Sequence, residues 1–149
     1  MKNILNPSHA REVLDRIDRL SPSSKPKWGE MDVAKMLAHC SAFQDIAMGN
    51  ASPKRSWSGI LIGGVAKPMF YNDKPLARNM STISAIKIVD ERNFEVEKGK
   101  LKQQIIVFQK KGAQECMGRP HPFFGKLTSE QWGKGIYKHL DHHLKQFGV

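Results

Sequence analysis

Four segments of the chain repeat their apolar residues every three or four positions, which is the spacing of one face of an α-helix. Polar or glycine residues at their ends suit helix starts and stops. The predicted helices lie between Asn6 and Ser21, between Asp32 and Gly49, between Phe94 and Gly112, and between Thr128 and Gly148. Four amphipathic helices predict an all-α fold, a four-helix bundle whose apolar faces meet in one core.

The segment between the second and third helices, residues 50–90, is too long for a structureless loop inside a compact domain. Near-helical spacing of Trp57, Ile60, Leu61 and Val65 predicts a short helix there, which we expect Pro68 to end. The β-branched stretch 81–89 is expected to run extended. The region is therefore a long crossover between helices 2 and 3.

The chain has 149 residues, a common size for one domain, so we expect a single domain over 1–149. No apolar run reaches the roughly 20 residues that span a bilayer, and the N-terminus does not resemble a secretory signal. Cys40 and Cys116 form no metal-binding spacing. We expect a cytoplasmic protein with reduced thiols and no membrane partner.

The formal net charge of +10 raises the question of nucleic-acid binding. The excess of lysine and arginine is spread along the chain, with only mild clusters at 98–104 and 109–112, and no nucleic-acid-binding signature accompanies it. A solubilising basic surface is the simpler interpretation. We expect no specific nucleic-acid partner.

Three of the six histidines lie close together near the end of the fourth predicted helix. Residues four apart share a helix face, so His139 and His143 can reach one ion, whereas His142 turns toward the side of Lys138 and Lys145. The same pair is also compatible with partly buried rings bonded to backbone carbonyls, or with a solvated basic tip. A zinc-type catalytic site needs a third protein ligand, and His39 on the second helix is the candidate.

The remaining histidines are weaker ligand candidates. His9 is expected on the surface of the first turn, and His121, between two prolines, in the packing of a loop. Other polar residues have structural interpretations: Asp141 as a surface ion-pair partner of Lys138 and Lys145, Glu30 and Asp32 at a helix start, and Cys40 as a small buried apolar residue. Four aromatic residues could line a pocket or belong to the core, namely Trp28, Phe123, Phe124 and Trp132.

His39, followed by H-x-x-H-H-x-x-Q in the last helix, resembles the DinB/YfiT-like metalloenzyme superfamily. The stretches "WGEMDVAKMLAHC" (28–40) and "HPFFGKLTSEQWGKGIYKHLDHHLKQFG" (121–148) are similar to a branch of it classed as a domain of unknown function. The resemblance covers the whole chain. It implies a DinB-like antiparallel four-helix bundle, frequently a homodimer, that holds a divalent metal through His39, His139 and His143. Superfamily members often read H-x-x-H-H-R-G-Q, whereas Leu144 and Lys145 replace the arginine and glycine here.

Three imidazoles leave the charge of a bound ion uncompensated, which favours an ionised water or thiol ligand. The resemblance implies a low-molecular-weight thiol as a second cofactor. We predict a metal-dependent transferase or hydrolase acting on a small-molecule substrate, with zinc, nickel, iron or manganese as the ion and with no catalytic protein residue assigned. The alternative is a non-catalytic bundle that binds a metal or another ligand.

Overall fold

The computed structural model describes residues 1–149, and the chain is mostly helical, in agreement with the all-α prediction. Five α-helices, one 3-10 helix and two very short strands make up the regular structure. Their order is α1 (Pro7–Asp18), α2 (Val33–Met48), α3 (Trp57–Phe70), η1 (Ser84–Ile86), α4 (Phe94–Glu115), β1 (Pro120–His121), β2 (Gly125–Lys126) and α5 (Ser129–Gln146). No helix is long and apolar enough to cross a membrane.

Each α-helix begins at a polar residue whose side chain accepts a hydrogen bond from a backbone N–H of the first turn. These residues are Asn6, Asp32, Ser56, Asn93 and Thr128. At α5 the Gln131 side chain also accepts from the Thr128 N–H, which completes a capping box. The start of the helix that carries three histidines is therefore fixed by the local sequence.

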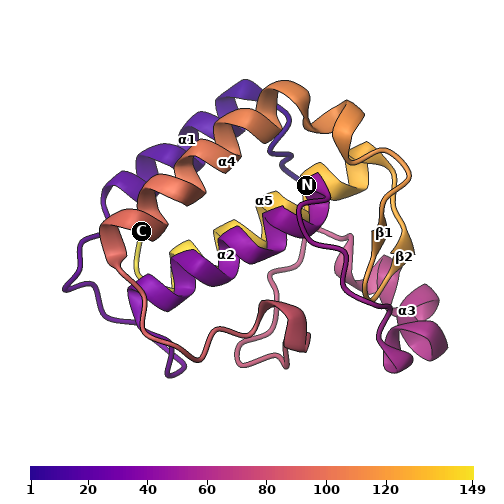
Figure 1. The fold of residues 1–149 in the computed structure, drawn as a ribbon, viewed down its shortest axis with the longest axis horizontal. Coiled ribbons are helices and arrows are strands. Elements are labelled where there is room, and N and C mark those ends of the chain that lie inside the picture. The colour runs from indigo at the N-terminus through magenta and orange to yellow at the C-terminus, as the bar shows by residue number, and fades with distance from the viewer.

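Helices α1, α2, α4 and α5 pack against one another, with α1 alongside α4 and α2 alongside α5 (Figure 1). Helix α2 is buried on nearly all sides, because it contacts α4, α5 and η1. A polar residue on α2 is thus enclosed by protein. This burial brings His39 into the interior rather than leaving it on a surface.

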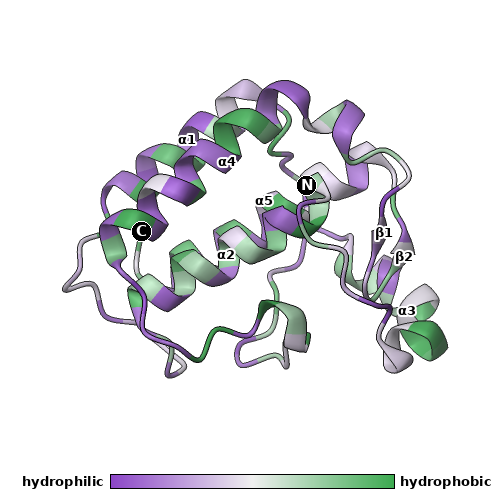
Figure 2. Cartoon of the chain, in the orientation of Figure 1, coloured by the Kyte–Doolittle hydropathy of each residue, from purple (hydrophilic) through white to green (hydrophobic).

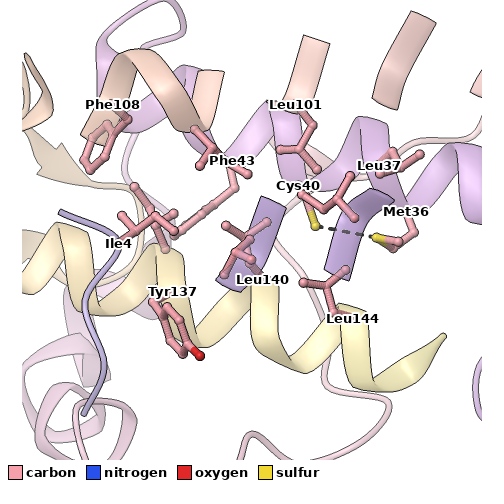
Figure 3. Close-up of a cluster of buried hydrophobic side chains, with 14 of the residues drawn as sticks. Ile4, Met36, Leu37, Cys40, Phe43, Leu101, Phe108, Tyr137, Leu140 and Leu144 are labelled. Atoms are coloured by element: carbon pink, nitrogen blue, oxygen red, sulfur yellow. Dashed lines mark hydrogen bonds between the residues drawn. The ribbon is translucent and has the colours of Figure 1, made fainter. Parts of the chain in front are cut away.

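One hydrophobic core of 26 buried residues lies between these helices. Figure 3 shows side chains from α2, α4 and α5 interlocking, among them Leu37, Leu101 and Leu140. Cys40 is buried there and lies 3.8 Å from the Met36 sulfur. Burial raises the pKa of the Cys40 thiol, so this residue acts as the apolar filler that the sequence predicted.

Three predicted helix ends differ from the structure. Helix α1 ends at Asp18 instead of Ser21. The N–H groups of Arg19 and Leu20 bond to carbonyls three residues back, which forms turns that still bury Leu20. Helix α3 continues past Pro68 to Phe70, since proline removes one helical hydrogen bond and the next turn still closes between Tyr71 N–H and the Lys67 carbonyl. Helix α4 passes Gly112, where a Cβ would lie 2.7 Å from the Phe108 ring; this glycine serves packing rather than termination.

The stretch 81–89 was expected to be extended, and it contains the 3-10 helix η1 instead. Its β-branched residues have no partner strand, so they form no ladder, and Ile86 packs into the core against α2. The β1–β2 hairpin was not predicted from the sequence. It pairs His121 with Gly125 and Pro120 with Lys126.

Helix α3 stands apart from the other four α-helices, beside the hairpin (Figure 1). Gly59 and Gly63 face the backbone of Phe123, and a Cβ on either would lie about 2.5 Å from the Phe123 carbonyl oxygen or closer. Only glycine therefore permits this close contact. Helix α3 therefore contacts the hairpin turn through its glycine face. Most of its large side chains lie on the other faces of the helix, exposed to solvent.

Candidate metal centre

Three histidine side chains converge at the interface of α2 and α5. One ring nitrogen from each of His39, His139 and His143 lies within 4.8 Å of the others. Metal–nitrogen bonds of about 2.0–2.1 Å place tetrahedral ligands about 3.4 Å apart, so this spacing is of the size that one ion requires. His139 and His143 share a face of α5, one turn apart, and His39 faces them from α2.

The ring orientation of His39 is set by a backbone carbonyl. Its Nδ1 lies 2.8 Å from the carbonyl oxygen of Ile86 in η1. A carbonyl can only accept, so His39 carries its proton on Nδ1 and presents the Nε2 lone pair to the cluster. A histidine that donates its second N–H in this way is the usual form of a metal ligand.

His143 is oriented through a side-chain relay. Gln146 Nε2 donates to the carbonyl oxygen of Trp28 over 2.7 Å, which turns Gln146 Oε1 toward His143 Nδ1 at 2.8 Å. The amide oxygen accepts, so the proton of His143 is also on Nδ1. Its Nε2 is left free to bind a cation.

His139 lacks such an outer partner. Its Nε2 lies 2.9 Å from His39 Nε2, and its Nδ1 is buried without a hydrogen bond. Since the His39 Nε2 already carries a lone pair, a proton or a cation must lie between the two nitrogens. The ring is held by packing against Phe43, whose centroid is 4.7 Å away.

The cluster favours neutral imidazoles. Burial lowers the pKa of His39, although the Ile86 hydrogen bond opposes the shift. Burial, followed by the neighbouring His39, lowers the pKa of His143 to about 3, and burial together with His143 and His39 holds the pKa of His139 well below its usual value. Neutral rings are the form that binds a metal.

A pocket of about 640 Å³ adjoins the cluster and includes all three histidines in its wall. Its other walls are largely apolar and come from the crossover, α2 and the hairpin turn, among them Phe43, Phe70, Ile83, Phe123 and Phe124. Glu30 is the one carboxylate in the lining. The arrangement joins three imidazoles that could hold a metal ion to a cavity of small-molecule size.

A family model described as "Protein of unknown function (DUF1569)" matches residues 2–148. The chain belongs to the DUF1569 family. No curated protein and no solved structure matches it. The family match spans His39, His139 and His143 alike, and the family description assigns no activity to them.

The other three histidines of this DUF1569 protein lie outside the cluster. His9 Nδ1 lies 3.2 Å from the Asn3 backbone N–H, and His121 Nδ1 accepts from the backbone N–H groups of Phe123 and Phe124. His121 is therefore committed to the hairpin turn, as predicted for a loop-packing residue. His142 packs edge-on against Trp28 and lines the pocket beside the cluster.

The structure also shows a contact that the sequence analysis missed. Asp141 pairs with Lys145 at 2.7 Å, as expected, and with the buried Arg16 of α1 at 2.8 Å. Burial opposes ionisation, but hydrogen bonds from Lys145 and Arg16 hold the pKa of Asp141 below its usual value. Lys138, the other predicted partner, instead donates to the carbonyls of Phe70 and Asn72.

Of the four aromatic candidates, Trp132 is fully buried in the core and the other three line the pocket.

Proposed function

We propose that this protein is a metal-dependent enzyme that holds one divalent ion through His39, His139 and His143. The observation that carries the proposal is the convergence of three neutral imidazoles from α2 and α5 at the base of an open cavity. The Nε2 atoms of His39 and His139 lie 2.9 Å apart, close enough for both to bind one cation. Zinc, nickel, iron and manganese are all compatible with this donor set.

A bound divalent ion would lower the pKa of a coordinated water or thiol and polarise a carbonyl. The chain contributes orientation: Ile86 and Gln146 hold the tautomers of His39 and His143. The apolar cavity wall excludes water and favours an apolar small-molecule substrate. We propose a low-molecular-weight thiol or a water molecule as the nucleophile, in a transferase or hydrolase reaction.

We also propose kinship with the DinB/YfiT-like superfamily. Its support is the packing of helices α1, α2, α4 and α5, the long crossover after α2, and the placement of one cluster histidine on α2 and two on α5. The Leu144 and Lys145 substitutions in the H-x-x-H-H-R-G-Q pattern leave substrate recognition to other residues. Residues of the crossover that line the pocket would then recognise the substrate.

Metal content tests the proposal directly. We expect tag-free protein to contain about one equivalent of a divalent ion by mass spectrometry, and His143→Ala to lose it, because three protein ligands are needed for a stable open site. His142→Ala is the matched control, since it removes the adjacent histidine outside the cluster. Equal metal content in the two variants, or none in wild-type protein after reconstitution, would overturn the proposal. In cobalt-loaded protein, a change of visible absorption on adding azide distinguishes an open catalytic position from a closed structural site.

The Gln146 relay provides a second test. We expect Gln146→Leu to weaken metal affinity by about 10- to 100-fold, because His143 Nδ1 then has no acceptor to fix its tautomer. Gln146→Glu keeps an acceptor at this position and should retain most of the affinity. Competition with a chromogenic chelator measures both. Equal affinities for Leu and Glu at residue 146 would contradict the assigned role.

A further inference from the structure

Helix α3 exposes an unusual amount of apolar surface. Six of its seven large apolar side chains are each 53–75% exposed, and they are Trp57, Ile60, Leu61, Ile62, Val65 and Met69. Figure 2 shows this helix at the edge of the molecule, with green segments between pale ones. A contiguous apolar patch of this kind on a soluble domain marks a binding surface.

The apolar surface covers most of the helix circumference. At 100° per residue, Ile60, Leu61, Ile62, Val65 and Met69 spread over an arc of about 200°, with the glycine face opposite. The arc contains no charged residue. A helix that packs on one neighbouring element typically has an apolar stripe of roughly 100°. The apolar arc of α3 is about twice as wide, so a binding partner that covers it has to surround more of the helix than one packed helix does.

The rim of this surface is basic. Lys54 and Arg55 precede the helix, Lys67 lies on its flank, and Lys67 donates to the backbone of Lys126 in the hairpin. None of these four cations makes a salt bridge, and no acidic residue occurs from residue 46 to residue 72. The surface therefore pairs an apolar centre with an unneutralised positive edge.

We propose that α3 docks the protein peripherally on an anionic lipid membrane, with its apolar arc in the acyl boundary and the basic rim at the headgroups. An interfacial helix buries apolar residues such as tryptophan and leucine and keeps lysine and arginine at the headgroups. Helix α3 has the tryptophan and leucine, its opposite face packs on the hairpin turn, and its neighbouring cations would supply the headgroup contacts. We expected no membrane partner because no segment spans a bilayer, and peripheral docking needs no such segment. A second copy of the chain is a poorer fit. Two α3 helices packed together would bring like-charged basic rims close to each other, and each would cover only part of the other's apolar arc.

Docking at α3 would place the cavity beside the lipid. Phe70, the last residue of α3, lines the pocket of the histidine cluster, and Phe123 contacts both the helix and the pocket. An apolar substrate could then enter from the membrane. The docking proposal itself is independent of any metal or activity, so it is tested on its own.

Vesicle co-sedimentation at physiological salt provides the test. We expect wild-type protein to bind vesicles of phosphatidylcholine mixed with phosphatidylglycerol, and to bind phosphatidylcholine alone at least about tenfold more weakly. Val65→Glu on α3 should reduce binding to the mixed vesicles by about tenfold or more. Val96→Glu on α4 is the matched control, because it changes the same residue type and the same net charge at a similar exposure.

Three outcomes would overturn the proposal. Equal binding of the two variants would mean that the overall charge of +10, and not α3, causes the vesicle association. A dimer in sedimentation equilibrium that Val65→Glu dissociates, without vesicle binding, would assign the surface to a second copy. If the protein neither binds vesicles nor dimerises, α3 has no lipid partner and the proposal is wrong. Far-ultraviolet circular dichroism checks that both variants keep wild-type helicity.

Discussion

Acidification of the metal-free protein is expected to remove about 4 kcal/mol of its stability as the pH falls from about 7 to about 5. Two buried histidines account for this figure. Burial lowers the pKa of His121 to about 4, and burial together with His39 lowers the pKa of His143 to about 3. Between those values and 6.5 the unfolded chain takes up the protons and the folded chain does not.

The sign and the window follow from these pKa values. Stability is greatest above pH 6.5 and falls as the unfolded state becomes protonated, by about 2 kcal/mol for each ring that is still neutral near pH 5. His39 and His139 act in the same direction. Carboxylates with a lowered pKa, such as Asp141, lose their contribution only below about pH 4.

Urea unfolding in the presence of a chelator, repeated across this pH range, measures the effect. His121→Asn is the informative variant, because its side-chain oxygen can accept the N–H groups of Phe123 and Phe124 without titrating. We expect it to reduce the acid-induced loss by about 2 kcal/mol. A stability that stays constant from pH 7 to about 5 would show that these histidines are not buried in solution.

Trp132→Ala is expected to lower the free energy of unfolding by about 3–5 kcal/mol. The side chain is fully buried where α5 begins, it packs against Phe43 and His121, and its Nε1 donates to the Arg119 carbonyl. Alanine would leave a large cavity and an unpaired carbonyl beneath the hairpin. Urea unfolding followed by circular dichroism gives the change without relying on tryptophan fluorescence.

Trp57→Ala is the matched control for that experiment. This side chain is 73% exposed, so its removal should change the stability by no more than about 0.5 kcal/mol. Comparable losses for the two variants would mean that α3 is packed in solution. The pair of tryptophan variants therefore also reports whether the apolar surface of α3 is free.

Helices α1, α2, α4 and α5 were predictable because apolar residues recur at helical spacing in each of them. Asp32, Thr128 and Gln131 cap their helices as the sequence indicated. The failures occurred where packing overrides the local preference of a residue. Gly112 is typical of a helix end, yet α4 continues past it with the buried Phe108 ring packed one turn before, and the β-branched stretch 81–89 lacks a partner strand.

The candidate site divides in the same way. The helical spacing of His139 and His143 and the polarity of α2 predicted that His39 could join them, and the structure brings the three together. Ile86 could not be foreseen, because it acts through a backbone carbonyl that any residue provides. The Arg16–Asp141 pair spans α1 and α5, and no local pattern encodes such a contact.

The separation of the cluster along the chain has a consequence for unfolding. His39 and His139 meet across 100 positions of sequence. An ion shared by these two rings would act as a reversible cross-link that ties distant parts of the unfolded chain, as a disulfide does. In the chain-entropy model a loop of this length restricts the unfolded ensemble by roughly 4–5 kcal/mol. Chelation would then resemble disulfide reduction, freeing chain entropy while the folded contacts stay the same.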